Sequence, residues 1–364
     1  MAMKKSPLHQ LHEKSGAHFE DIGGFDVPVM FSSVEQEYTA LRKQVGIVDL
    51  SHKARFRVNG SGRLGFLDQV LTSNISGAGP RSVSTSFLCN EKGGVIDRVT
   101  VFKDEQYILL SGSPENRARV HQWLQQQAEE HPEFSVEIID VGTSQGQLEL
   151  VGPNAQMLLE TVSGGLAEIR EYRSELTQVG TARCLVSRRK FSGLDGFIVT
   201  AGSVYLPTLY ETFLQAGRAH GVRPVGERAI EMLRIEAGLA GVGRELSEDV
   251  TPIEVGAVTL IDYNKVFFNG RLGIIHSMAA EFQRRMVMLK VIGQQQPPER
   301  ADICLGMMPI GYITSSILSP QLRCGVALGF VDALKSAVGT RLHLRNETES
   351  MEAEVMRSPF AMVI

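Results

Sequence analysis

The sequence predicts a chain of mixed helices and strands that ends in a small all-β region. Apolar residues recur at helical spacing over residues 33–45, 207–215 and 229–236. Between these segments lie short runs that alternate apolar and polar side chains, which is typical of strands. After about residue 277 only short strand-like runs remain, so we expect a domain boundary between residues 277 and 284.

The clearest predicted helix covers residues 33–45. Its apolar stripe falls at helical spacing, at Val34, Tyr38, Leu41 and Val45. Ser33, with Gln36 three residues later, has the pattern of a capping box, and Gly46 supplies a stop signal. Farther along, residues 54–58 alternate as a strand, and residues 64–71 have the spacing of a second helix.

Asp97 lies in the string GGVIDRVTVF, which alternates like a strand. One parity of this strand carries Val95, Asp97, Val99 and Val101, and residues two apart on a strand share a face. Three valines indicate a buried face, where a carboxylate is costly unless something pairs with it. Asp97 is therefore a candidate working residue. The alternative is a buried aspartate that accepts hydrogen bonds from backbone amides.

A hairpin and a helix are expected next. The strand with Asp97 ends in a turn, and residues 107–110 return beside it as an antiparallel partner. Ser113 and Pro114 have the pattern of an N-cap and a first helical residue, so we expect a helix to begin there and to continue past residue 124.

The remaining expected elements are short. Strands are expected at residues 134–141, 148–151, 181–186 and 197–200, and the string GPNAQ opens a helix at residue 152. After residue 277 the expected strands are residues 286–292, 310–315, 326–330, 341–344 and 352–356. Strands at this spacing indicate a small barrel or a sandwich.

Composition and charge argue against several classes of protein. The net charge of −4 gives no basic footprint for nucleic acid. No apolar run reaches the ~18 residues of a membrane span, and the N-terminus lacks the apolar core of a signal peptide, so we expect a cytoplasmic protein without a membrane partner. The cysteines form no CxxC pair and the histidines form no HxxxH pattern, so neither a disulfide framework nor a metal site is indicated. We interpret His9 and His12 as surface histidines.

Several strings in this chain resemble strings of the aminomethyltransferase family, whose best-known member is the T-protein of the glycine cleavage system. They are IVDLSHK, NEKGGVIDRV, VGPNAQ, LRIEAG, KVFFNGR and GYITSSILSPQLRCGVALGFV, and they occur in the family's order over most of the chain. The resemblance implies an α+β protein, a three-lobed folate-binding fold with a central channel. Residues 1–277 would form the two folate-binding lobes and residues 284–364 a small C-terminal β-barrel.

The resemblance also implies a site for tetrahydrofolate. In the family, the first aspartate of GGVIDD faces the reactive nitrogens of the folate, and Asp97 takes that place; it would hold the amine and accept or relay a proton. The family's glutamate that binds the pterin ring is replaced by Leu194, and Ile198 replaces a second glutamate. Three readings stay open: Asp195 substitutes, the pterin is held differently, or folate is not the ligand.

Three further residues are candidate folate contacts, each with a structural alternative. Ser113 corresponds to a family asparagine, and its alternative is the helix cap. Arg271 matches a family arginine that holds the carboxylate-bearing tail or the fold around it, and its alternative is a salt bridge. Arg234 has a structural ion pair with Glu236 as its favoured alternative. In IVDLSH, we interpret Asp49 as a turn cap and His52 as a packed side chain, because no nucleophile lies at a suggestive spacing.

Three functions are compatible with these strings. The first is tetrahydrofolate-dependent transfer of an aminomethyl or methyl group; in the T-protein version a lipoyl carrier protein is the donor and ammonia is released. The second is a non-catalytic tetrahydrofolate-binding protein that assists iron–sulfur cluster maturation. Residues 234–249 resemble that branch, but Phe267 stands in the place of its cysteine. The third is a folate or small-ligand sensor without chemistry. We expect the first.

Overall fold

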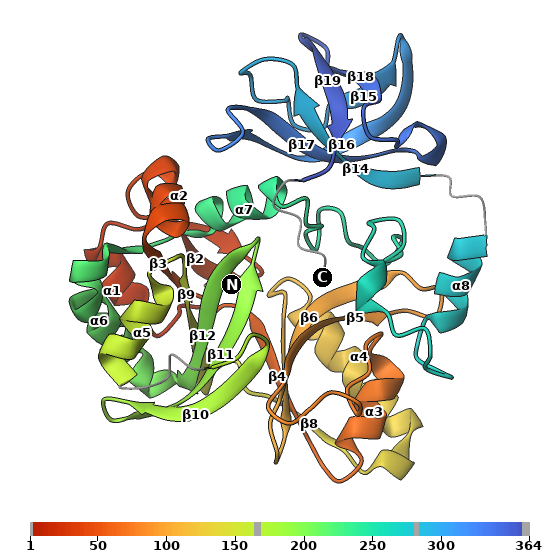
Figure 1. The fold of residues 1–364 in the computed structure, drawn as a ribbon. Coiled ribbons are helices and arrows are strands. Elements are labelled where there is room, and N and C mark those ends of the chain that lie inside the picture. The colour runs from red at the N-terminus through yellow and green to blue at the C-terminus, as the bar shows by residue number, and fades with distance from the viewer. Residues whose placement is uncertain (1–2, 164–168, 280–283, 359–364) are drawn as a thin grey trace. The chain divides into compact units, whose positions relative to one another are not determined.

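The computed structural model describes residues 3–163, 169–279 and 284–358. These residues form two compact units. Unit 1 combines the chain up to Ser86 with Arg98–Ile230, and unit 2 combines Phe87–Asp97 with the chain from Glu231 onward (Figure 1). The predicted boundary between residues 277 and 284 falls mostly on residues 280–283, outside the described residues.

Unit 1 contains a six-stranded sheet. Its strand order is β10 (Arg173–Val179), β11 (Ala182–Phe191), β12 (Leu194–Gly202), β9 (Gln145–Val151), β3 (Val45–Asp49) and β13 (Val222–Pro224). Neighbouring strands are antiparallel except for the parallel pair β3 and β13. The predicted strands at residues 148–151, 181–186 and 197–200 are thereby confirmed, each somewhat longer than the sequence pattern indicated.

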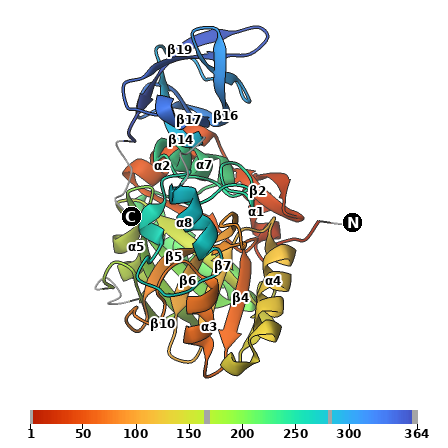
Figure 2. The same cartoon turned by 90° about the vertical axis from the view of Figure 1, so that its right-hand side faces the viewer.

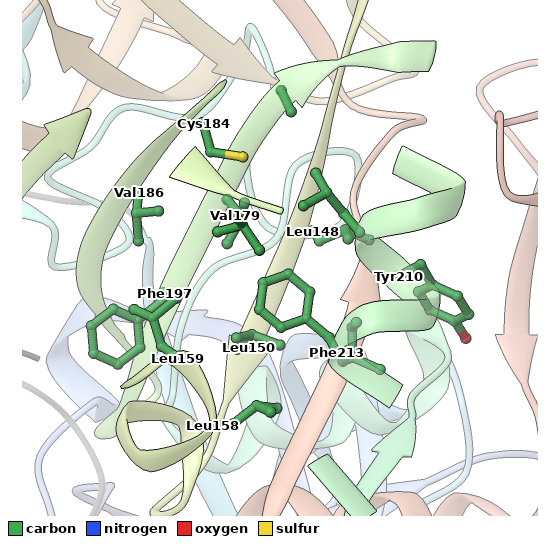
Figure 3. Packing of buried hydrophobic residues seen from close by; sticks show 14 of the residues in the cluster. Leu148, Leu150, Leu158, Leu159, Val179, Cys184, Val186, Phe197, Tyr210 and Phe213 are labelled. Atoms are coloured by element: carbon green, nitrogen blue, oxygen red, sulfur yellow. The ribbon is translucent and has the colours of Figure 1, made fainter. Parts of the chain in front are cut away.

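One face of this sheet carries the main hydrophobic core of unit 1. Helices α5 (Ala155–Ser163) and α6 (Leu206–Ala216) cover it with Leu158, Leu159, Leu209 and Phe213. Figure 3 shows Leu158, Leu159 and Phe213 near Leu148, Leu150 and Phe197 of the sheet, with Tyr210 at the edge and its hydroxyl turned away from the aliphatic groups. The core therefore fixes β9 and β12 rigidly from one side.

The other face of the six-stranded sheet, here called the inner face, packs on a second sheet. That sheet has the order β5 (Val83–Cys89), β6 (Val95–Lys103), β7 (Ile108–Gly112), β4 (Ala54–Asn59) and β8 (Glu137–Asp140). Leu185 and Ile198 of the inner face meet Phe102 and Leu109 of the second sheet in one buried cluster. β6 and β7 are antiparallel, which confirms the predicted hairpin.

Helices α3 (Arg63–Val70) and α4 (Arg117–Glu130) complete unit 1. α4 lies along β4 and β8 (Figure 2), and the ring of its His121 stacks on Phe56 of β4 at 5.5 Å between centroids. The short strands β1 (His18–Ile22) and β2 (Phe25–Met30) form a separate antiparallel ribbon, preceded by α1 (His9–Lys14).

Helix α2 (Val34–Lys43) begins as predicted and ends earlier. The hydroxyl of Ser33 accepts a hydrogen bond from the amide of Gln36 at 3.2 Å, which confirms the N-cap. Gly46, predicted to stop the helix, instead lies inside β3. A Cβ at this position would come within 2.6 Å of the Leu41 side chain, so the glycine allows α2 to pack closely against the strand.

Two other local predictions were wrong. Helix α4 begins at Arg117 with Asn116 as the N-cap residue, so Ser113 does not cap it and Pro114 is not its first residue. The strand expected over residues 134–141 begins only at Glu137, because Pro132–Phe134 form a 3-10 turn that ends in Ser135 with a positive φ of 47°.

Unit 2 has two hydrophobic clusters outside its barrel core. Helix α7 (Glu227–Glu236) leads into it, and α8 (Arg271–Ala279) follows a long irregular segment. Phe87 and Val95 pack here against Leu246, Phe268 and Ile274. The turn between β5 and β6 is thus anchored by residues more than 150 positions later in the chain.

The C-terminal part of unit 2 is a closed six-stranded barrel, so the choice between barrel and sandwich is settled. Its strand order is β14 (Arg284–Val291), β17 (Cys324–Asp332), β16 (Met308–Ser319), β15 (Asp302–Leu305), β18 (Arg341–Arg345) and β19 (Ser350–Met356). The five predicted strands are confirmed, and β15 was missed because it is four residues long. No helix among the described residues is long and apolar enough to cross a membrane.

Candidate functional site

Asp97 lies on β6 and is fully buried, with 0% of its surface exposed. Val95, Val99 and Val101, which share its parity, are each at most 1% exposed. The structure therefore confirms the predicted buried row and the unusual position of a carboxyl group within it.

The turn before Asp97 is built by glycines that fit against later parts of unit 2. Gly93 has a φ of +83°, and a Cβ there would lie 2.7 Å from the backbone nitrogen of Ile274 at α8. A Cβ on Gly94 would lie 1.8 Å from the carbonyl oxygen of Glu248. Asn90 donates from Nδ2 to that same carbonyl at 2.9 Å. Tertiary packing thereby brings the GGVID and NGR strings together, as close approach of glycine backbones permits.

Arg271 is the first residue of α8 and is half-buried. Its Nε atom is buried and has no hydrogen-bond partner, and its guanidinium forms no ion pair with another described residue. The salt bridge considered as the alternative role is therefore absent from the described residues. A cation is also disfavoured at a helix N-terminus, because the helix dipole is positive there. An anion bound at Arg271 would offset both costs.

Arg234 is buried and held on three sides within unit 2. Its Nε donates to Glu231 at 2.8 Å, Nη1 donates to Glu245 at 2.9 Å, and Nη2 donates to the Ser315 hydroxyl at 2.8 Å. Burial acts to lower the pKa of Arg234, but the two glutamates outweigh it and hold the pKa above its usual value.

The expected ion pair between Arg234 and Glu236 is not formed; that prediction was wrong. Glu236 lies on α7 two residues after Arg234, too far around the helix to share a face with it, and it accepts a hydrogen bond from Ser319 instead. Glu231, three residues earlier, and Glu245, in the following loop, take the role assigned to Glu236.

Asp195 and Leu194 lie at the start of β12 and point to opposite faces of the sheet. Leu194 shares parity with Ile198 on the inner face, whereas Asp195 shares parity with Phe197 in the main core. Asp195 forms a two-pronged pair with Arg188, with Nε to Oδ1 at 3.1 Å and Nη2 to Oδ2 at 2.6 Å. This hydrogen bonding raises the pKa of Arg188.

Ser113 directly follows β7 and is 9% exposed. It lies four positions before Arg117, the first residue of α4, so the helix-cap alternative for Ser113 does not hold. Its assignment as a folate contact stays a prediction.

The IVDLSH string forms a buried polar cluster in unit 1 that serves the fold. Asp49 accepts hydrogen bonds from the Ser51 amide at 2.8 Å, the Ser6 hydroxyl at 2.8 Å and Nε2 of His12 at 3.0 Å. Burial acts to raise the pKa of Asp49, but the hydrogen bond and charge of His12 outweigh it and hold that pKa well below its usual range. Asp49 thus caps the turn, as expected.

The histidines of this cluster are buried. His9 is 5% exposed and His12 is 1% exposed, so their interpretation as surface histidines was wrong. The terminal segment folds back onto unit 1, where Asp49 binds His12, and this contact has no signal in local sequence. His52 packs as expected, and its burial, followed by the charge of Lys53, lowers its pKa to about 3.

One buried pair was missed from the sequence. Glu149 on β9 and Arg189 on β11 both lie on the inner face, and Glu149 has a side chain only 3% exposed. Its Oε1 accepts a hydrogen bond from Nε of Arg189 at 2.9 Å, and Nη2 of the same arginine lies 2.8 Å from that oxygen in the ion pair. The signal was the alternation QGQLELV, which reads as a polar strand face turned to solvent.

The chain matches family models over nearly its whole length. Residues 8–265 match the GCVT N-terminal domain, and residues 284–361 match the glycine cleavage T-protein C-terminal barrel domain. Aminomethyltransferases from Caldanaerobacter subterraneus subsp. tengcongensis and Desulfitobacterium hafniense are each 30% identical to this chain; the matches cover 98% of this chain and 96% and 98% of those proteins.

A solved structure agrees with these matches. The glycine cleavage system aminomethyltransferase T from Bartonella henselae aligns with a TM-score of 0.90 at 26% identity, over 99% of this chain and 98% of that chain. The fold is therefore the α+β fold of that class, with its C-terminal six-stranded barrel. The chain belongs to the glycine cleavage T-protein family.

Proposed function

We propose that this protein transfers a one-carbon unit, an aminomethyl or methyl group, to tetrahydrofolate, and that Asp97 faces the reactive nitrogens of the folate. The observation that carries the proposal is the complete burial of the Asp97 carboxyl in a row of valines. A carboxylate shielded from water interacts strongly with a nearby amine, and it accepts or relays a proton more effectively than one in solvent.

The residues of the chain fit part of this ligand. Folate carries a carboxylate-bearing tail, and Arg271 offers it a half-buried guanidinium whose Nε is unpartnered. We propose Arg271 as the tail contact and Ser113 as a weaker polar contact near the ring. Bound tetrahydrofolate would supply the nitrogen nucleophile, while Asp97 would orient that amine and hold the proton that it releases.

The fit is less good for Arg234 and Asp195. All three nitrogens of the Arg234 guanidinium already donate to protein groups. Any effect of Arg234 on folate would therefore be indirect, through the residues that it holds in place. The two oxygens of Asp195 are both taken by Arg188, on the sheet face opposite to Leu194. Both assignments stay proposals, and the geometry favours Asp97 and Arg271 over them.

Family membership supports the reaction class and a lipoyl carrier protein as donor partner, since the relatives described above are named aminomethyltransferases. The non-catalytic alternative, a tetrahydrofolate-binding maturation factor, shares the folate site and differs in lacking transfer. Product formation therefore separates the two.

The test compares Asp97→Asn with the wild-type protein. We expect tetrahydrofolate to bind both proteins in isothermal titration, and we expect methylenetetrahydrofolate formation from aminomethylated lipoyl carrier protein to fall about 100-fold or more in the variant. Asp302→Asn, at an exposed aspartate of the barrel, is the matched control and should leave both readouts unchanged.

Each contrary result has a definite meaning. A wild-type protein that gives neither heat nor thermal stabilisation with tetrahydrofolate removes both folate functions. Binding without product from a lipoyl or methyl donor supports the maturation alternative. An Asp97→Asn protein with undiminished transfer shows that the carboxyl is structural.

A further inference from the structure

Several polar groups on the inner face of the six-stranded sheet hydrogen-bond to each other. Gln147 accepts from the Ser111 hydroxyl at 3.1 Å and donates to Thr200 at 3.0 Å. Ser187 and Ser174 share a hydrogen bond of 2.8 Å. These buried groups therefore need nothing more from a ligand or from water.

Glu149 differs from these groups. Its Oε1 accepts a hydrogen bond from Nε of Arg189 at 2.9 Å and lies 2.8 Å from Nη2, whereas its Oε2 accepts none from any described residue, in a side chain that is 3% exposed. Oε2 is not fully buried, so a donor from outside the chain can reach it. Such a half-satisfied group indicates a place for a donor that the chain itself does not supply.

The position of Glu149 on the sheet indicates which donor. A Cβ on Gly196 of β12 would lie 3.6 Å from Oε1 of Glu149, so the carboxylate leans over Gly196. Leu194 is two residues from Gly196 and therefore on the same face of β12. Asp195, between them, faces the other way. Glu149 thus places a carboxylate on the inner face near Leu194, the residue that stands where the family has a glutamate.

We propose that Glu149, held by Arg189, is the carboxylate that receives the amino–imine edge of the pterin ring in this protein, with Oε2 accepting from the 2-amino group. The proposal rests on the proposed function for the identity of the ligand. Arg189 is a positioning residue: it occupies Oε1 and fixes the carboxylate plane. The pair compensates for Leu194 by moving the acid from β12 to the adjacent strand β9.

The first experiment measures tetrahydrofolate affinity by isothermal titration for Glu149→Gln. We expect a dissociation constant about 10- to 100-fold weaker than wild type, because a charge-assisted hydrogen bond is lost. Glu175→Gln is the matched control. It removes a glutamate that pairs with Arg81 at 2.7 Å on the same sheet but is 47% exposed, and it should leave the affinity within about twofold.

The second experiment uses the wild-type protein and needs no substitution to fold. A tetrahydrofolate analogue without the 2-amino group should bind wild type as weakly as tetrahydrofolate binds Glu149→Gln, and Glu149→Gln should not distinguish the two ligands. Loss of discrimination is a result that a purely structural Glu149 would not produce.

Three results would overturn the proposal, and they are distinguishable. Wild type that binds tetrahydrofolate, with Glu149→Gln folded and equally tight, assigns Glu149 to structure and leaves the proposed function standing. Equal affinity of wild type for the analogue and for tetrahydrofolate does the same even if Glu149→Gln fails to fold. Wild type that binds no tetrahydrofolate removes the proposed function and this inference together.

Discussion

Two arginine–glutamate pairs of this protein, each with a buried glutamate, differ in how completely the carboxylate is hydrogen-bonded. In unit 2, Glu245 accepts from Arg234, from the Gly241 amide at 2.8 Å and from the hydroxyls of Thr314 and Ser315 at 2.6 Å each. In unit 1, Glu149 accepts from Arg189 alone.

The comparison shows how a structural carboxylate can be told from a binding one. Both oxygens of Glu245 are saturated, and although burial acts to raise its pKa, Arg234 and the hydroxyl donors hold that pKa below its usual value. It joins the loop after α7 to strand β16 of the barrel. Glu149, whose side chain is 3% exposed against 0% for Glu245, keeps one oxygen open to a donor from outside the chain. Whether the second carboxylate oxygen has a hydrogen-bond donor within the chain, more than how deeply the side chain is buried, distinguishes a structural glutamate from a binding one.

The largest expected effect comes from breaking the complete pair. Glu245→Gln should reduce the free energy of unfolding by about 3 kcal/mol, because it leaves Arg234 buried with only part of its compensation. Urea denaturation measures the loss. Glu231→Gln, at the partner that is 38% exposed, should cost less than about 1 kcal/mol. Equal losses at the two positions would show that Glu245 is not the dominant partner.

A buried group that is kept neutral extends the comparison to pH. Burial lowers the pKa of His52 to about 3 in the folded protein from an ordinary value of 6.5. Between these values the unfolded chain binds a proton that the folded chain does not, so stability falls as the pH falls below 6.5. The slope should approach about 1.4 kcal/mol per pH unit for this one group.

Thermal or urea unfolding at pH 7, 6 and 5 measures that slope. His52→Gln should flatten it by the contribution of one proton, whereas wild type keeps the steep dependence. Identical pH profiles for the two proteins would show that His52 is protonated in the folded state near its ordinary pKa.

A smaller effect is expected where an ion pair is partly hydrated. Asp195→Asn removes the two-pronged partner of Arg188. Because the side chains of Asp195 and Arg188 are 28% and 19% exposed, the free energy of unfolding should fall by about 1 kcal/mol or less. Because Asp195 faces away from Leu194, we expect its tetrahydrofolate affinity to stay that of wild type. Weaker binding in titration would instead assign the pterin contact to Asp195.

The smallest stability change is expected at Glu149, where the comparison began. Glu149→Gln should lower the free energy of unfolding by less than about 1 kcal/mol, because Arg189 keeps 20% of its side chain exposed and is not left as a buried, unpaired charge. The same substitution would thus cost several-fold more at Glu245. A loss of unfolding free energy at Glu149 as large as that at Glu245 would show that both pairs serve to stabilise the fold.

Much of the fold followed from local pattern. Alternation placed Asp97 in a buried row and found five of the six barrel strands, because side-chain period is a property of the strand itself. The family strings then indicated the order of the parts. The element ends were less accurate, as at Gly46 and Ser113, because turn signals compete with packing.

The candidate site was only partly predictable. Strings in the sequence named Arg271 and Asp97 as candidates, which they remain. The partner of Arg234 was misassigned, since Glu245 is eleven residues away in an irregular loop. His12 was assigned to the surface although it lies against Asp49, 37 residues later. Contacts across such separations leave no periodic trace in one sequence.

The sequence by itself determined which residues share a strand face, as in the row that carries Asp97, because alternation is set by backbone geometry alone. Only the tertiary structure decided which of those faces is dry. The polar row on β9 reads as a solvent face, and it becomes an interior because a second sheet covers it. Burial is a property of what packs on a face, and that partner comes from elsewhere in the chain.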